Sequence, residues 1–475
     1  MVFSSLTFLC VFLPVVFALY CVIPGLKAKN ILLIAASLLF YAYGEPVYVL
    51  LMLASAVYNY IFARIIGNTE KTGVRKAALA AAVVLNLGVL GVFKYAGFAV
   101  GSLNAVTGLG LPVPEITLPI GISFFTFQAL SYVIDVYRGQ TPAEKSFFNI
   151  LLYISFFPQL IAGPIVKFHD VNEALSNRTQ TFEGVQTGLR RFICGLGKKV
   201  IIANVMGQTA DAVFGADEGV LNSPLAWLGA ACYMLQIYYD FSGYSDMAIG
   251  LGRMFGFHFK ENFNYPYTAL NVQDFWRRWH ISMSTWFKEY LYIPLGGNRK
   301  GKARTAVNKI IVFFCTGLWH GANWTFVVWG LYHGFFLLLE TYVPALKKMP
   351  KALGRLYAWA VVCIGFVFFR ADTIGKGAAF IGKMFAGFSN SGESTALLLK
   401  QLTPWFIFIF TVAVLGAGLM EKPISKIKAM ANGKTETKAA LAVRVIVDVI
   451  SLALLVWCVM RLSAQGYNPF IYFRF

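Results

Sequence analysis

Five histidines are the residues of this chain best suited to acid–base chemistry: His169, His258, His280, His320 and His333. His320 is flanked by tryptophans in the segment Trp319-His-Gly-Ala-Asn-Trp324. An imidazole, with a pKa of about 6.5, can take a proton from an alcohol and return it to a thiolate leaving group. Gly321 would let a ligand approach the backbone, and Asn323 could bind a carbonyl group or orient the ring. The alternative is a core histidine bonded to a backbone carbonyl.

His280 lies in a segment, 274–290, that is rich in aromatic and basic residues. On a helix, one face would carry His280 together with Trp276, Trp279, Met283, Trp286, Phe287 and Tyr290. Such a helix is typical of the membrane interface or of a re-entrant segment. The basic side could attract coenzyme A or anionic lipid. The alternative places His280 at the level of the lipid headgroups.

A third group of polar residues follows the apolar run that begins at Ala226. Asp240 and Ser242 lie at the deep end of this run, where Gly243 could break the helix and Ser242 or Ser245 could cap the next one. Asp240 is therefore predicted to line a cavity near a histidine. The alternative makes Asp240 and Asp246 capping groups at a helix junction.

The composition explains where these residues must be placed. Hydrophobic residues make up 58% of the 475 and charged residues only 13%, whereas a soluble chain has about 25% charged residues. The bilayer is therefore the expected solvent. The net charge of +19 comes from short basic loops, a pattern typical of cytoplasmic loops and not of nucleic-acid binding. The seven cysteines show no metal-binding spacing, so no metal site is predicted.

Apolar runs and basic loops predict the topology. We expect the first span at Met1–Ile23, retained as a span and not removed as a signal peptide. Five further early spans are predicted. The second begins near residue 30, the third ends near 66 and the fourth ends near 100. The fifth covers 118–137 and the sixth covers 147–167. The loops after spans one, three and five are basic, which places the N-terminus outside the cytoplasm. A last span at 445–460 places the tail, 463–475, on the same side.

The histidine segment lies where there is too little apolar sequence for two spans. About 31 mostly apolar residues, 310–340, separate the basic loops 298–309 and 347–355, and two full spans need roughly 40. Two short helices meeting inside the membrane at 319–324 are expected, with His320 at the wall of an internal cavity. The sequence contains no serine-hydrolase elbow, Walker A motif, zinc-protease motif or dinucleotide fingerprint.

Several segments together resemble the membrane-bound O-acyltransferase family, and especially its bacterial branch that acetylates secreted polysaccharides such as alginate. Relatives in this branch acetylate peptidoglycan or move D-alanine onto teichoic acids. The resemblance rests on the segments 119–127, 157–164, 239–246, 274–280, 319–324 and 467–475.

The resemblance implies one all-α, polytopic membrane domain over 1–475. Its fold would be a ring of roughly 11 tilted transmembrane helices, with re-entrant and interfacial helices around a through-membrane tunnel. His320 matches the catalytic histidine of the family, and His280 matches a second position that is often Asn or His. Trp319, Asn323, Trp279, Asp240 and Ser242 are then expected to bind substrate. The acyl donor would be a cytoplasmic thioester, acetyl-CoA, and the chain would lie in a bacterial inner membrane.

The C-terminal segment Phe470-Ile-Tyr472-Phe-Arg-Phe475 has the form FxYxxF. It resembles the C-terminal motif of a small partner peptide in D-alanine transfer systems. We hypothesise that Tyr472 accepts the acyl group, with His320 as general base, because a phenol of pKa about 10 needs a base at neutral pH. An extracytoplasmic esterase-like partner of the SGNH type would then acylate the polysaccharide. The alternative is an aromatic belt that anchors the last helix.

Three other functions fit parts of the sequence. Membrane histidines could line the pathway of a transporter or channel for acyl groups or polymer. A lipid or protein O-acyltransferase like those of eukaryotes would have the same fold, although the compact chain and fused tail argue against it. D-alanyl transfer to teichoic acid would use the same residues with another acyl group.

Overall fold

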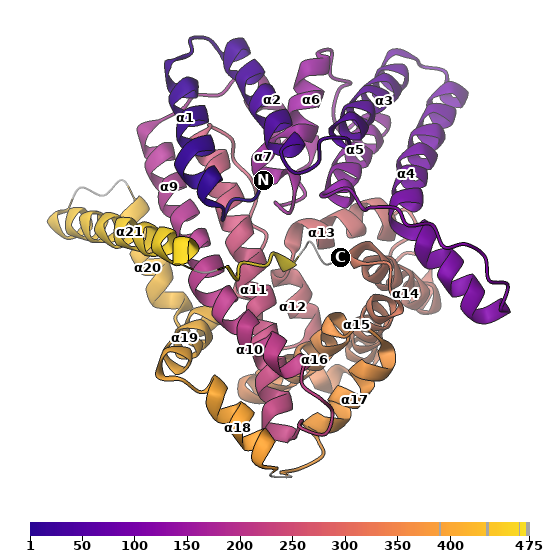
Figure 1. The fold of residues 1–475 in the computed structure, drawn as a ribbon. Helices are drawn as coiled ribbons and strands as arrows, with labels where there is room; N and C mark the ends of the chain where they lie inside the picture. Colours follow the sequence, from indigo (N-terminus) through magenta and orange to yellow (C-terminus); the bar gives the residue numbers. More distant parts are fainter. Residues whose placement is uncertain (389–390, 434–436, 465, 472–475) are drawn as a thin grey trace. The chain divides into compact units, whose positions relative to one another are not determined.

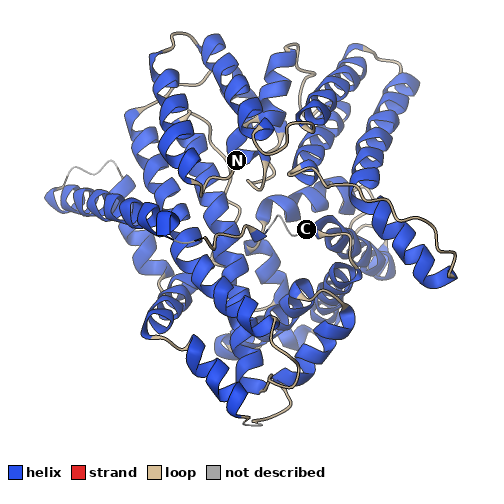
Figure 2. Ribbon diagram, viewed as in Figure 1, coloured by secondary structure: helices blue, strands red, loops and turns tan. Residues whose placement is uncertain are grey.

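The computed structural model describes residues 1–388, 391–433, 437–464 and 466–471, and every regular element in these ranges is a helix (Figures 1 and 2). The predicted all-α class is therefore confirmed. The residues form two compact units, 1–192 with 245–260 and 193–244 with 261–475. Each unit is described by itself, and a single domain over 1–475 stays a prediction.

The first unit contains the predicted early spans. Its helices are η1 (Phe8–Phe12), α1 (Leu13–Val22), α2 (Leu26–Ala42), α3 (Val49–Asn68), α4 (Thr72–Thr107), α5 (Ile122–Tyr137), α6 (Phe147–Ser155), α7 (Phe157–Leu160) and α8 (Phe168–Ser176). Helices α3 and α4 are long and apolar enough to cross a membrane, and α5 is a shorter apolar helix. The first five predicted spans therefore correspond to helices in the predicted order.

The sixth predicted span, 147–167, is wrong as a continuous helix. Helix α6 ends at Ser155, and the four-residue α7 starts again with Pro158 near its first position. Proline has no N–H for the helical ladder and is tolerated only in the first turn. The backbone N–H of Phe157 donates instead to the hydroxyl of Ser37 at 3.1 Å. This segment is buried within its unit, so its apolar residues serve the protein core.

The second unit contains the site segments. Helices α9 (Phe182–Gly197) and α11 (Ser223–Met254) contribute residues to both units. The other elements are η2 (Lys198–Ala203), α10 (Asn204–Phe214), η3 (Pro266–Thr268), α12 (Val272–Arg278), α13 (Ile281–Phe287), η4 (Lys288–Tyr292), α14 (Gly301–His320), α15 (Trp324–Tyr342), η5 (Pro344–Lys347), α16 (Lys351–Arg370), α17 (Ile374–Met384), α18 (Gly392–Gln401), α19 (Pro404–Val414), η6 (Leu415–Leu419), α20 (Glu421–Asn432) and α21 (Lys438–Ala464).

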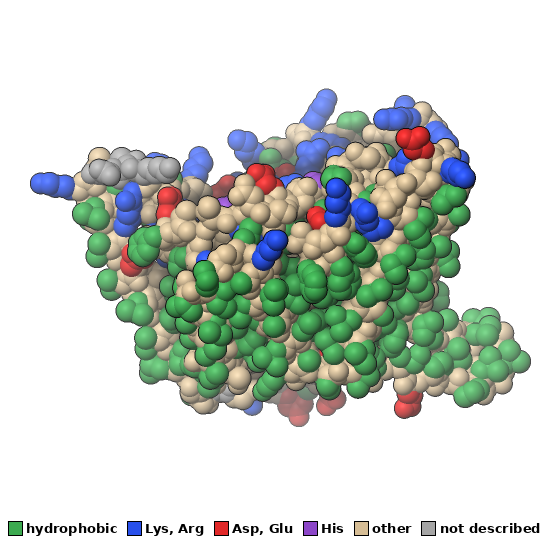
Figure 3. All heavy atoms as spheres, turned by 90° about the horizontal axis from the view of Figure 1, so that it is seen from above, with side chains coloured by type: hydrophobic (Ala, Val, Ile, Leu, Met, Phe, Trp, Pro, Cys, Tyr) green, Lys and Arg blue, Asp and Glu red, His purple; other side chains and the backbone are tan. Residues whose placement is uncertain are grey.

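The exposed surface of these helices identifies a multi-pass membrane protein. Four helices in the described residues, α3, α4, α16 and α21, could each cross a bilayer, and the bent pair 392–401 and 404–419 would make five. Helix α21 contains the predicted last span and exposes large apolar side chains along its length, including Leu441, Val449 and Leu452. Figure 3 shows hydrophobic side chains over much of the visible face. Water would disfavour such a surface, whereas lipid would not.

Helix α11 corrects the prediction of a break at Gly243. The helix is continuous from Ser223 to Met254, so Ser242 and Ser245 lie within it and cap nothing. A Cβ atom on Gly243 would lie 2.7 Å from the carbonyl oxygen of Gly195 in α9. The glycine therefore allows two helices to approach closely, and its lack of a side chain serves packing, not a turn.

Candidate functional site

His320 is the last residue of α14, and the chain resumes helical structure at Trp324. The predicted break at 319–324 is confirmed. The two helices have 20 and 19 residues, so the prediction of short helices is wrong. Helix α14 begins at Gly301 and includes Lys302 and Arg304, which the charge pattern assigned to a loop. Lysine and arginine are good helix formers, and their charged ends can extend away from an apolar face.

Two glycines let α14 and α15 pack against each other near the break. A Cβ atom on Gly317 would lie 2.3 Å from the carbonyl oxygen of Phe326, and one on Gly330 would lie 2.2 Å from that of Phe313. Real Cβ atoms do not approach so closely, so only glycine fits at both positions. Because Gly317 precedes His320 by less than one turn, this contact also determines where the imidazole lies.

The His320 ring is enclosed by aromatic side chains. Its centroid lies 5.0 Å from the rings of Trp319 and Trp329 and 5.1 Å from that of Phe369. The residue is only 4% exposed. A buried apolar surround strengthens electrostatic contacts with any group that reaches the imidazole.

His280 lies between α12 and α13, with a left-handed backbone at φ 45°. The predicted continuous helix over 274–290 is therefore wrong. Left-handed backbone is strained for a residue with a side chain and is often found at functional sites. The ring is fully buried among protein groups, including Phe241 at 4.6 Å between centroids. This burial does not fit a histidine that merely lies among lipid headgroups.

Asn262 orients the His280 ring. Its Oδ1 atom lies 3.3 Å from His280 Nδ1 and also accepts hydrogen bonds from the backbone N–H and the hydroxyl of Ser282. An oxygen acceptor at Nδ1 assigns the proton to that nitrogen and the lone pair to Nε2. No described residue hydrogen-bonds to Nε2, which is buried. Burial lowers the pKa of His280 to about 3, so the ring is neutral at pH 7.

The two candidate histidines lie in the same cluster. The ring centroids of His280 and His320 are 6.5 Å apart, and Trp319 lies 5.7 Å from the His280 ring. Trp279 packs against Phe275 and Phe366. The sequence therefore identified two imidazoles that the fold brings together from segments 40 residues apart.

Asn323 has a structural role in addition to any role in binding. Its Oδ1 atom accepts the backbone N–H of Thr325, which caps α15, and its Nδ2 donates to the carbonyl of Asp372. Both contacts fix the direction in which α15 leaves the break. Substrate binding by Asn323, Trp319, Trp279 and Ser242 stays a prediction.

Asp240 forms a buried ion pair that the sequence did not reveal. Its Oδ1 atom lies 2.7 Å from Lys199 Nζ, and the two side chains are 1% and 4% exposed. Its Oδ2 atom accepts the backbone N–H of Ile471 at 2.8 Å, and Lys199 also donates to the carbonyl of Pro469. The predicted capping alternative for Asp240 is wrong, because the residue lies inside α11. Lys199 was missed because it lies 41 residues before Asp240 in the chain, where no local pattern indicates a partner.

The C-terminal segment 467–471 is held along its length. The Tyr467 hydroxyl donates to Asp211 Oδ2 at 2.7 Å, and Asn204 Nδ2 donates to the Tyr467 carbonyl and the Asn468 amide. Phe470 is buried and packs on Tyr244 with 4.9 Å between ring centroids. These contacts are with protein, which does not fit a lipid-facing aromatic belt for 467–471. Tyr472 itself lies outside the described residues.

The remaining histidines are not among the predicted site residues, although Trp329 packs on the rings of both His320 and His333. His333 is fully buried, and its Nδ1 accepts a hydrogen bond from the indole of Trp276 at 3.4 Å. His258 is exposed.

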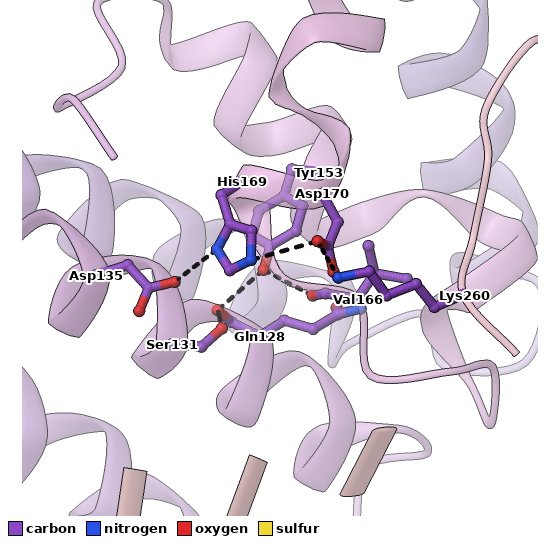
Figure 4. Close-up of polar contacts among 8 residues, drawn as sticks. All are labelled: Gln128, Ser131, Asp135, Tyr153, Val166, His169, Asp170 and Lys260. Atoms are coloured by element: carbon purple, nitrogen blue, oxygen red, sulfur yellow. Dashed lines mark hydrogen bonds and ion pairs between the residues drawn. The ribbon is translucent and has the colours of Figure 1, made fainter. Parts of the chain in front are cut away.

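His169, in the first unit, bridges two carboxylates (Figure 4). Its Nδ1 lies 3.2 Å from Asp135 and its Nε2 lies 3.3 Å from Asp170, which Lys260 approaches to 2.6 Å. This cluster ties α5 to α8, and no sequence pattern indicated it, because Asp135 lies 34 residues from His169 and Lys260 lies 90 residues from Asp170.

Known proteins are similar to this chain over the segments that build this site. The model of the membrane-bound O-acyltransferase family matches residues 141–371. The chain is 40% identical to the probable alginate O-acetylase of Azotobacter vinelandii, over 100% of both proteins. It is 39% identical to the peptidoglycan O-acetyltransferase of Helicobacter pylori over 79% of this chain and 78% of that protein. The chain is 28% identical to a teichoic acid D-alanyltransferase of Bacillus subtilis over 53% of this chain and 68% of that protein.

Proposed function

Because the chain belongs to the membrane-bound O-acyltransferase family, we propose that this O-acyltransferase moves an acetyl group from cytoplasmic acetyl-CoA across the membrane for O-acylation of a secreted or cell-wall polysaccharide. The full-length similarity to a probable alginate O-acetylase supports acetyl over D-alanyl transfer, since the D-alanyltransferase matches only part of the chain. The names of the two O-acetylating relatives include alginate and peptidoglycan. These names suggest alginate or peptidoglycan as the acceptor.

The observation that carries this proposal is the pair of buried imidazoles. His320 closes α14 within an aromatic surround, and His280 lies 6.5 Å away between ring centroids with its tautomer set by Asn262. His320 acts as general base on the acceptor hydroxyl. His280 is neutral at pH 7, so its Nε2 lone pair can accept a hydrogen bond from the acyl donor or from the acceptor molecule.

The acceptor in the first transfer is the phenol of Tyr472. His320 removes the phenolic proton as the oxygen attacks the thioester carbonyl, the carbon–sulfur bond breaks, and the proton passes to the departing thiolate. The products are an acetyl ester on Tyr472 and free coenzyme A. This step is supported by the anchoring of the preceding residue, Ile471, through its backbone N–H. An SGNH-type esterase-like partner then moves the acetyl group from Tyr472 to a polysaccharide hydroxyl.

This route requires a defined orientation in the membrane. The basic loops favour an N-terminus and a C-terminus outside the cytoplasm of a bacterial inner membrane. A ring of roughly 11 tilted helices around a tunnel would let the thioester enter from the cytoplasm and the acyl group leave on the other side.

The test is thioester consumption by the purified protein in lipid vesicles. Wild type should release coenzyme A from acetyl-CoA, and His320→Ala should release at least about 100-fold less, as expected for loss of a general base. His258→Ala is the matched control, because His258 is exposed. Equal release by wild type and His320→Ala would overturn the enzyme proposal and favour a transporter or channel.

The Tyr472 step has its own test. Tyr472→Phe removes only the phenolic oxygen, so the protein should reach the membrane in normal amounts while polymer acetylation is lost. Mass spectrometry of wild type after exposure to acetyl-CoA should find acetyl on the C-terminal peptide. Normal polymer acetylation by Tyr472→Phe would exclude the relay but leave His320-dependent thioester cleavage intact.

A further inference from the structure

We propose that Lys199 and Asp240 are positioning residues that clamp the backbone of the C-terminal segment so that the residue after Ile471 is presented for acyl transfer. The purpose of this clamp rests on the proposed function of Tyr472. The clamp itself rests on contacts within 467–471 and the helices that hold it.

Two features distinguish this ion pair from a pair that merely stabilises the fold. It is almost fully buried, with side-chain exposures of 4% and 1%. Each partner also contacts the tail backbone, Asp240 at the N–H of Ile471 and Lys199 at the carbonyl of Pro469. Neither charged group would be expected inside an apolar unit without such a set of partners.

The helices are shaped to form the pair. Lys199 lies in η2, a π-helical turn between α9 and α10, and such turns are common at functional sites. Asp240 lies on α11, and Gly243 lets that helix approach η2. A Cβ atom built on Gly243 would lie 3.2 Å from the Cβ atom of Lys198. The neighbouring residue of Asp240, Phe241, contacts the His280 ring. One short stretch of α11 therefore contacts both the tail and a candidate catalytic histidine.

The tail is recognised mainly through its backbone at the clamp. The two clamp contacts are with main-chain atoms, whereas Tyr467 and Phe470 are held through their side chains by Asp211 and Tyr244. Main-chain contacts at both 469 and 471 fix the register of the segment up to Ile471, and the proposal is that this register presents the next side chain for acyl transfer. A shift in register would misplace that side chain, and misplacement by about 1 Å can cost about 100-fold in rate.

The decisive variant is the double change Lys199→Met and Asp240→Asn. Removing one partner would leave an unpaired buried charge, whereas removing both charges is better tolerated by the fold. We expect normal membrane insertion and thermal stability in detergent but about 100-fold less polymer acetylation. Asp217→Asn makes the same chemical change at an exposed carboxylate and serves as the control.

A covalent tether separates positioning from general stabilisation. Asn204 Nδ2 lies 3.3 Å from Asn468 Oδ1, so these two side chains face each other, and Asn204→Cys with Asn468→Cys is designed to hold the tail on α10 through a disulfide. In the double variant, this disulfide should form more slowly than with Lys199 and Asp240 intact. Once formed, it should restore most of the lost acetylation, and dithiothreitol should remove the gain.

Three results would overturn the clamp. They are wild-type acetylation by the double variant, an unchanged rate of disulfide formation, and failure of the formed disulfide to restore acetylation in a folded protein. If Tyr472→Phe is inactive while the double variant is active, the clamp is wrong and the relay stands. If Tyr472→Phe is active, the relay is wrong, and the rate of disulfide formation alone decides whether Lys199 and Asp240 hold the tail.

Discussion

The Oδ1 atom of Asn262 lies 3.3 Å from Nδ1 of His280, and the same oxygen accepts two hydrogen bonds from Ser282. One amide therefore fixes both the imidazole and the start of α13. The backbone N–H of Ile281 adds a bond to the Asn262 carbonyl at 2.9 Å. His280 is consequently oriented by a residue 18 positions before it in the chain, and the lone pair of its ring is on Nε2.

Asn262→Ala should disturb this arrangement with little change in the rest of the fold. The loss leaves the partly buried N–H of Ser282 without its acceptor, at a cost of roughly 1 kcal/mol in stability. The freed His280 ring can also rotate, so coenzyme A release should fall about 10- to 100-fold. Coenzyme A release from acetyl-CoA and thermal unfolding in detergent measure the two effects. Asn298→Ala, at an exposed amide, should change neither.

The low pKa of His280 makes a prediction about pH. Because burial lowers this pKa to about 3, the ring stays neutral as pH falls from about 8 to about 5 and takes up a proton only well below that range. The family position that His280 matches is often Asn, so His280→Asn should keep measurable activity. Its rate of coenzyme A release should vary with pH between about 5 and 8 just as wild type does. If the rate of wild type fell between pH 8 and pH 5 and the rate of His280→Asn did not, His280 would be shown to titrate in that range.

The crossing of α14 and α15 should tolerate no side chain at Gly317 or Gly330. A Cβ atom at these positions would lie 2.3 Å and 2.2 Å from backbone oxygens. Gly330→Ala should therefore push the helices apart, destabilise the protein by about 1–3 kcal/mol and reduce coenzyme A release through displacement of His320. Thermal unfolding in detergent and the acetyl-CoA assay report these changes.

Gly382→Ala provides the comparison for the glycine prediction. Gly382 lies within α17, and no atom lies within 4 Å of a Cβ built there. Alanine favours helix over glycine by about 1 kcal/mol, so this variant should be as stable as wild type or more so. Equal destabilisation by Gly330→Ala and Gly382→Ala would contradict the role of close packing.

The sequence predicted well those features that depend on local pattern. Apolar runs and the Trp319–Trp324 interruption located α3, α4, α21 and the break after His320. Such features follow from hydrophobic length and from the small number of polar residues inside apolar runs. The family resemblance then selected His280 and His320 from five histidines.

The failures concern features that depend on tertiary contacts. The Gly243 position looked like a helix break, but its role is a close approach to Gly195 from another helix. The segment around His280 has a continuous helical face by periodicity, yet contacts with Asn262 stabilise a left-handed residue there. The Lys199–Asp240 pair joins residues separated by 41 positions, and no local pattern indicates such a partner.

Glu340 is a further residue that sequence patterns did not single out, and it yields the last prediction. This carboxylate of α15 is 1% exposed and accepts the backbone N–H groups of Val272 at 2.6 Å and Gln273 at 3.0 Å. It therefore caps the first turn of α12, the helix that leads directly to His280, and a negative charge at that end is favourable.

Glu340→Gln retains only one oxygen acceptor and removes the charge, so it should cost about 1–2 kcal/mol in stability and loosen the turn that precedes His280. Coenzyme A release should fall less than in Asn262→Ala, because Glu340 acts on the helix and not on the imidazole itself. Glu421→Gln, in the first turn of α20, makes the same change at a helix start that carries no site residue. If Glu340→Gln matched Glu421→Gln in both stability and coenzyme A release, the cap would have no part in orienting His280.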